Sequence, residues 1–288
     1  EFRRVLFRSL TASQIRALST AEVNALTTTQ IGGLTTTQIA SLENADMAAL
    51  TTDQVGALST SQVAALTVGM VSNLSTEQVA ALGTTNVTAL TDVQVRALTT
   101  ASVAALGTDQ VSVLTTSQVT ALTATAVGAL STDQVGALTT NQVKVLTTAN
   151  IVALNTAQVA ALSTDQVSAL TTAQVRAIAT DDVQALTTSA VGILSSSQLQ
   201  ALSNAAVAAL TTDQVAALST SQVPKLTTTE VAALTTSQVQ ALNTDQVQSL
   251  QVSQLVAMTT AQVNALTTTQ IGALTNTQLM GLVTAAKP

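Results

Sequence analysis

The sequence lacks several residue types on which functional chemistry depends. It contains no Cys, His, Trp or Tyr, and its two aromatic residues are Phe2 and Phe7. The absence of Cys excludes disulfides and thiolate metal sites. Heme has no suitable axial ligand, because His, Cys and Tyr are missing and the four Met residues are isolated. A Ser or Thr nucleophile would lack an activating base, so we expect a protein that is not an enzyme and holds no cofactor.

Charge and long apolar runs are also scarce. Charged residues make up 8% of the chain, and the net charge is −6. An acidic chain without basic clusters or interleaved aromatics is a poor nucleic-acid binder. A membrane span needs about 20 consecutive apolar residues, whereas Thr, Ser and Gln interrupt the apolar residues throughout this sequence. We therefore expect neither nucleic-acid binding nor membrane insertion.

The first nine residues do not follow the pattern of the rest. Residues 1–9 read EFRRVLFRS, which resembles the translation of a common sequencing-adapter oligonucleotide. We interpret them as a sequencing-adapter artefact of a metagenomic fragment, outside the fold, so that the true N-terminus is missing. The alternative is a basic N-terminal tail. Without this segment, 14 acidic and 6 basic side chains remain, a net charge of −8.

A strict eight-residue repeat fills the remainder of the chain. Leu stands at every eighth position from Leu10 to Leu282, with Ile178 and Met258 as the exceptions. Val, Ile or another apolar residue follows five positions later, and the consensus is L-[ST]-T-x-Q-V-x-A. We call each unit an octad and number its positions from the Leu. A fixed short period predicts a repeat architecture over 10–282, with residues 283–288 as a frayed or truncated end.

Each octad carries the signals of a helix start. In the octad of residues 50–57, Thr51 and Gln54 have the spacing of a capping box, in which each side chain accepts from the backbone N–H of the other. Leu50 and Val55 have the spacing of a hydrophobic staple across that start. Asp53 falls in the first turn, where the helix dipole favours a carboxylate. These coincident signals predict one short capped helix per octad.

The predicted fold is all-α, a solenoid with about three octads per turn. One continuous helix is disfavoured, because eight residues advance about 80° beyond two full turns and the Leu stripe would wind around the helix. A β-solenoid is the alternative, since Thr and Val favour strands. However, no octad position is reserved for the Gly or Asn that strand corners usually need.

A longer rhythm is superimposed on the octads. Position 5 is usually Gln, and its replacements recur in steps of 24 and 32 residues, so that the pattern repeats after 80 residues. The replacements are Glu22, Asp46, Met70, Asn86, Ser102, Ala126, Asn150, Asp182, Ala190, Ala206 and Glu230, of which Asn86 and Ala190 lie out of step. We interpret the rhythm as a turn of three to three-and-a-third octads, which would place the replacements on one side. The alternative is duplication of a 24- or 80-residue unit without spatial meaning.

Acidic residues at position 4 are the one periodic charged feature and the candidate site. They predict an acidic stripe along one side of the solenoid, formed by Asp53, Glu77, Asp109, Asp133, Asp165, Asp213 and Asp245. A ladder of carboxylates could hold Ca²⁺, which takes six to eight oxygen ligands. One carboxylate per turn supplies too few, and the helix dipole already accounts for acids at this position. We therefore assign no metal and no catalytic residue.

The octad L-T-T-D-Q-V-x-A-L resembles the octapeptide arrays of very large bacterial surface or secreted proteins, described as adhesin-like or as "heme utilization or adhesion" proteins. The resemblance covers nearly all of residues 10–282 and implies an extracellular or cell-surface stalk; the residue composition gives its heme part no support. The octad also resembles the first helix of TAL-effector repeats, but the base-reading loop is absent.

The expected function is therefore structural. We expect a non-catalytic spacer or stalk with an adhesive face, whose partner is an unidentified protein or surface. The alternative is an intracellular scaffold that binds proteins. Binding solenoids usually vary one face with large side chains, whereas this array offers mainly Thr, Ser and Ala.

Overall fold

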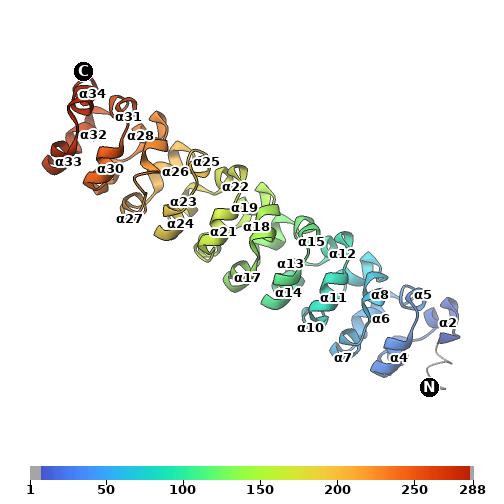
Figure 1. Cartoon of the computed structure of the whole chain (residues 1–288). Coiled ribbons are helices and arrows are strands. Elements are labelled where there is room, and N and C mark those ends of the chain that lie inside the picture. The colour runs from blue at the N-terminus through green and yellow to red at the C-terminus, as the bar shows by residue number, and fades with distance from the viewer. Residues whose placement is uncertain (1–7, 286–288) are drawn as a thin grey trace. The chain divides into compact units, whose positions relative to one another are not determined.

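The computed structural model describes residues 8–285, with the side chains of 284 and 285 excepted, as a succession of short helices. No strand occurs among the described residues, so the all-α prediction is confirmed and the β-solenoid alternative is wrong. The chain divides into two units at residue 146, and each is treated by itself (Figure 1).

Each helix of the first unit occupies one octad. The helices are α2 (Ala12–Arg16), α3 (Thr20–Asn24), α4 (Thr28–Gly33), α5 (Thr36–Ile39), α6 (Asn44–Ala49), α7 (Thr52–Gly56), α8 (Thr60–Ala64), α9 (Val68–Ser72), α10 (Thr76–Ala81), α11 (Gly83–Ala89), α12 (Asp92–Ala97), α13 (Thr100–Ala104), α14 (Thr108–Val113), α15 (Thr116–Ala121), α16 (Ala124–Gly128), α17 (Thr132–Ala137) and α18 (Thr140–Val145).

The second unit repeats this arrangement. Its elements are α19 (Thr148–Ala153), α20 (Thr156–Ala160), α21 (Thr164–Ala169), α22 (Thr172–Ala177), α23 (Thr180–Val183), α24 (Thr188–Gly192), α25 (Ser196–Leu199), α26 (Asn204–Ala209), α27 (Thr212–Ala216), the 3₁₀ helix η1 (Val223–Lys225), α28 (Thr228–Ala233), α29 (Thr236–Ala241), α30 (Thr244–Ser249), α31 (Val252–Val256), α32 (Thr260–Ala265), α33 (Thr268–Ala273) and α34 (Asn276–Ala285).

The capping box forms as predicted. In α7 the Gln54 N–H donates to Thr51 Oγ1 at 3.2 Å, and the Thr51 N–H donates to Gln54 Oε1 at 2.8 Å. At the other end of the octad, the Leu58 N–H donates to the Val55 carbonyl at 3.2 Å. Leu58 is also the residue before the next N-cap, Ser59. The Leu of each octad therefore ends one helix and prepares the start of the next.

The core of each unit consists of the two apolar positions of every octad. Val55, Val63 and Val71 are fully buried, and Leu58 and Leu66 are 3% and 4% exposed. A helix of under two turns cannot be stable alone, because helix nucleation is unfavourable and few residues repay it. Packing against neighbouring turns therefore provides the stability of each octad.

Each helix packs on the third helix before it. In the first unit α10 contacts α7, and α15 contacts α12; in the second unit α30 contacts α33, and α23 contacts α26. The helices along the lower edge in Figure 1 are α7, α10, α14 and α17 in the first unit. Because these helices follow one another in steps of three and four octads, one turn holds slightly more than three octads, as the longer rhythm predicts.

The described part of the predicted artefact comprises Arg8 and Ser9, since residues 1–7 lie outside the described range. The Arg8 Nε donates to the Gly33 carbonyl at 3.0 Å. At the other end α34 continues through residue 285, and residues 286–288 lie outside the described range. The expected boundaries at 10 and 282 stay predictions.

Two glycines at the same octad position predict opposite effects of one substitution. Gly107 is an N-cap with φ −70°, and a Cβ added there would have no neighbour closer than 3.7 Å. Gly83 has φ +69°, in the left-handed region. We expect Gly107→Thr to stabilise the fold by about 0.5–1 kcal/mol, by adding a cap and restricting the unfolded chain. Gly83→Thr should cost about 1–2 kcal/mol. Urea unfolding would measure both; changes of the same sign would contradict the assignment.

One helix start lacks its side-chain cap. Ala179 is the N-cap of α23 and offers no hydroxyl, whereas Ser163 caps the Gln166 N–H of α21. Ala179→Ser should therefore raise the free energy of unfolding by about 1 kcal/mol, and Ser163→Ala should lower it by about the same amount. Thermal unfolding of the two variants checks this pair. An unchanged midpoint for Ala179→Ser would show that another group already satisfies this helix start.

Candidate functional site

The buried Gln side chains form the most ordered polar feature of the structure. Gln118 of α15 is 1% exposed, and its Oε1 accepts from the Thr115 N–H at 2.8 Å. Its Nε2 donates to the carbonyls of Val87 and Leu90, at 2.9 and 2.7 Å. Val87 belongs to α11, the fourth helix before α15. One amide therefore caps the start of its own helix and the end of a helix in the preceding turn.

This inter-turn bond recurs along both units. The acceptors are backbone carbonyls 28 to 31 residues earlier in the chain. The Gln residues that donate in this way are Gln38, Gln54, Gln62, Gln78, Gln94, Gln110, Gln118, Gln134 and Gln142 in the first unit, and Gln198, Gln214, Gln222, Gln238, Gln246, Gln254, Gln262, Gln270 and Gln278 in the second. Among the described residues, no buried side-chain nitrogen or oxygen lacks a partner.

Sequence reasoning found only the capping half of this function. A capping box accepts Glu as readily as Gln, because only an acceptor oxygen is needed at this position. The strong preference for Gln is the signal that a donor is needed as well. A Glu at position 5 would keep the cap and lose the inter-turn bond.

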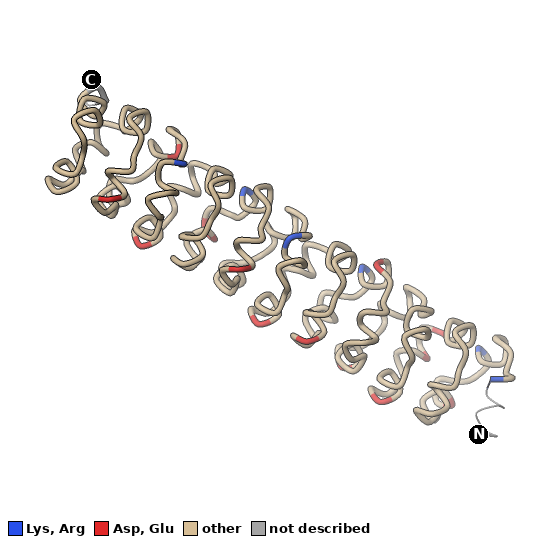
Figure 2. The backbone as a smooth tube through the Cα atoms, in the orientation of Figure 1, with Lys and Arg blue, Asp and Glu red and all other residues tan. Residues whose placement is uncertain are grey.

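The acidic stripe lies where the longer rhythm predicts. In the first unit Asp53, Glu77, Asp109 and Asp133 stand in the first turns of α7, α10, α14 and α17. These helices share the lower edge in Figure 1, and Figure 2 shows acidic positions along the same edge. In the second unit Asp165, Asp213 and Asp245 stand in α21, α27 and α30, which also share an edge. All seven side chains are exposed.

The stripe has the electrostatics of helix capping rather than of a metal centre. Each helix contributes one carboxylate, and among residues 8–285 no three Asp, Glu, His or Cys side chains gather as a metal ion requires. Hydrogen bonds from its own backbone N–H and from the hydroxyls of Ser75 and Thr76 lower the pKa of Glu77. The Thr76 hydroxyl donates to Glu77 Oε1 at 2.9 Å. These carboxylates are therefore stabilised locally.

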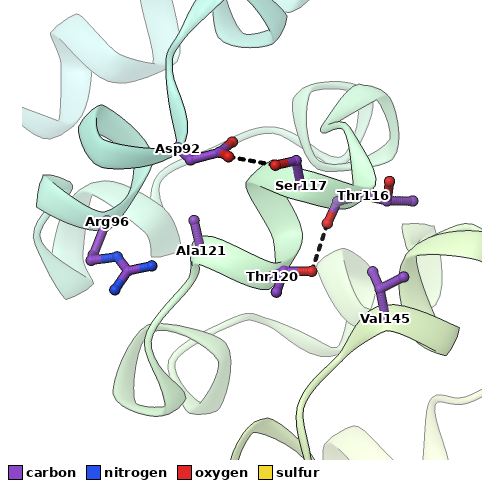
Figure 3. Close-up of a pocket in the computed structure, with 7 residues that line it drawn as sticks. All are labelled: Asp92, Arg96, Thr116, Ser117, Thr120, Ala121 and Val145. Carbon is purple, nitrogen blue, oxygen red and sulfur yellow. Dashed lines mark hydrogen bonds between the residues drawn. The ribbon is translucent and has the colours of Figure 1, made fainter.

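An open hollow of about 320 Å³ lies beside α12 and α15 (Figure 3). It is lined by Asp92, Arg96, Thr116, Ser117, Thr120, Ala121 and Val145. The Ser117 hydroxyl donates to Asp92, and the Thr120 hydroxyl donates to the Thr116 carbonyl at 2.8 Å. A Ser bound to a carboxylate without His or Lys among the lining residues is not the arrangement of an activated nucleophile.

The described helices were also compared with the length of a membrane span. The longest, α34, has 10 residues, about half of what a bilayer requires. Within residues 8–285, no helix is both long and apolar enough to cross a membrane.

The fold and its inter-turn bonds define a helical repeat protein, a solenoid of octads. The ALTTAQ repeat family matches residues 7–36, 39–76, 93–124, 117–148, 143–172, 194–228, 225–252 and 248–284. These segments cover most of the chain, and the family motif can be read directly at residues 169–174. The chain belongs to the ALTTAQ repeat family. No curated protein matches it.

Proposed function

We propose that the array is a non-catalytic spacer or stalk, part of a large bacterial surface or secreted protein and located outside the cell or at its surface. The observation that carries the proposal is the uniformity of the octads. The same caps, the same two core positions and the same inter-turn bond recur in both units. Such a segment extends by adding turns, and its exposed positions 2–4 carry mainly small Thr, Ser and Ala side chains.

The adhesive face of this proposal is the side that carries the acidic stripe. Its carboxylates are exposed, one per helix, and they recur in steps of three and four octads. A partner protein or surface would meet a regular ladder of single charges and hydroxyls. The rival function is an intracellular scaffold for proteins, which usually presents larger side chains on one face.

Long-read sequencing across both ends of the fragment tests the proposal, because it recovers the complete open reading frame. We expect a secretion signal, glycine–aspartate calcium-binding repeats or further adhesin modules beside the array. A cytosolic catalytic or signalling domain in the same reading frame would refute the surface location and favour the scaffold. The sequence of residues 1–9 in the recovered gene would test the adapter interpretation at the same time.

A further inference from the structure

One side of the solenoid lacks the amide bonds that hold the other sides together. Position 5 is not Gln at Asp46, Met70, Ser102 and Ala126 of the first unit, nor at Asp182, Ala206 and Glu230 of the second. We call these seven residues the seam. They belong to α6, α9, α13, α16, α23, α26 and α28, and the pairs α6·α9, α13·α16, α23·α26 and α26·α28 pack directly. All seven side chains are buried.

The chemistry of the seam residues removes the inter-turn bond. Met70, Ala126 and Ala206 have no N–H or O–H in their side chains. The Ser102 hydroxyl is paired with Thr99 Oγ1 of its own cap at 2.8 Å. Glu230 accepts from the Thr227 N–H at 2.6 Å through Oε2, and a carboxylate has no hydrogen to give to a carbonyl.

The two aspartates of the seam make a different contact. Asp46 Oδ1 accepts from the Thr20 hydroxyl at 3.0 Å, and Asp182 Oδ1 accepts from the Thr156 hydroxyl at 2.7 Å. Each bond joins two side chains of adjacent turns, and no amide caps a backbone carbonyl there. Since a flexible Thr side chain ends such a bond, it fixes the turn spacing less firmly than an amide held on two backbones.

The other sides of the same turns are bonded through the backbone. Gln134 of α17 is 3% exposed and donates to the carbonyls of Ala104 and Leu106. Ala126, eight residues earlier, has the same burial but offers only a methyl group. The difference recurs in the second unit between Gln214 and Ala206, which are 2% and 3% exposed. Apolar packing is therefore alike on the two sides, and the amide bond distinguishes them.

We propose that the seam is the line along which neighbouring turns part. Under bending or tension the turns separate first at the seam, while the Gln-bonded sides act as hinges. Each unit therefore has a built-in direction of bending, set by which octads carry Gln at position 5. This property does not depend on where the protein is located or on its partners.

Amide hydrogen exchange of the full chain tests the seam. Val127 of α16 and Val135 of α17 are matched amides: both are fully buried, and they donate to Thr123 and Ser131 carbonyls at 3.0 and 2.9 Å. We expect Val127, beside the seam, to exchange about tenfold faster than Val135, because its turn opens without breaking two amide–carbonyl bonds. Equal exchange rates at the two amides would overturn the proposal.

Filling the seam supplies a second measurement. In Ala126→Gln the new amide lies in register with the carbonyls of Val95 and Leu98, 31 and 28 residues earlier. We expect exchange at Val127 to slow about fivefold. The control is Ala126→Met, which adds similar volume without a donor and follows the native example of Met70. If both variants slow exchange equally, volume rather than the missing bond governs opening, and the proposal fails. If Ala126→Gln does not fold, the wild-type comparison of Val127 with Val135 still decides.

Discussion

Replacing Gln118 by Glu is expected to destabilise the fold by about 3–5 kcal/mol. The introduced carboxylate would keep the acceptor for the Thr115 N–H and nearly the same shape. It would lack the amide N–H groups that now meet the carbonyls of Val87 and Leu90. A buried carboxylate oxygen would instead face these carbonyls, which are also negative. Urea unfolding followed by circular dichroism measures the effect.

The reverse substitution within the seam is the matched control. Glu230 is 2% exposed and occupies the same octad position as Gln118. Glu230→Gln would supply an amide in register with the carbonyls of Leu199 and Leu202 and should stabilise the protein by about 1–2 kcal/mol. If Gln118→Glu is neutral while Glu230→Gln is also neutral, the inter-turn bonds contribute no net stability. The role assigned to them would then be wrong.

Truncating a core Leu is the second large effect. Leu66 is 4% exposed and packs between turns of the first unit. Leu66→Ala should cost about 2–5 kcal/mol, through lost apolar burial and the cavity that remains. The backbone bond from the Leu66 N–H to the Val63 carbonyl is unaffected, so the loss reports packing alone. Chemical unfolding in urea gives the value.

Leu18 is the control for this truncation. It has the same octad position as Leu66 but is only half-buried, in the second octad of the array. We expect Leu18→Ala to cost about 1–2 kcal/mol, because less apolar surface is lost. Equal costs at the two positions would contradict the dependence of each octad on neighbours on both sides. Such dependence is the usual energetic behaviour of repeat proteins.

The local structure could be predicted from the sequence because its causes are local. Thr51 and Gln54 are three residues apart, and Leu50 and Val55 are five apart, so the cap and the staple need no tertiary information. The inter-turn bonds could not be derived in this way. The acceptor of Gln118 lies 28 to 31 residues earlier, and it is defined only when the number of octads per turn is known.

The candidate site shows the same limit. The spacing of Asp53, Glu77 and Asp109 predicted a common side, and the structure places their helices along one edge. The replacements of Gln at Met70 and Ala126 were visible as a rhythm, but their physical meaning required the partner carbonyls. No residue of the array specifies a partner, since the exposed positions carry the same small side chains in nearly every octad.

The inter-turn bond reaches back across more than three octads, yet its acceptor is defined only by its place within an octad. Removing or duplicating one whole octad gives each affected Gln an equivalent carbonyl in the new register, and every Leu keeps both of its roles. Inserting a single residue breaks the cap, the staple and the register at once. In genetic terms, the array tolerates changes in steps of 24 nucleotides. We therefore expect natural copies of the gene to differ in length by whole octads, as replication slippage on repeated DNA would produce.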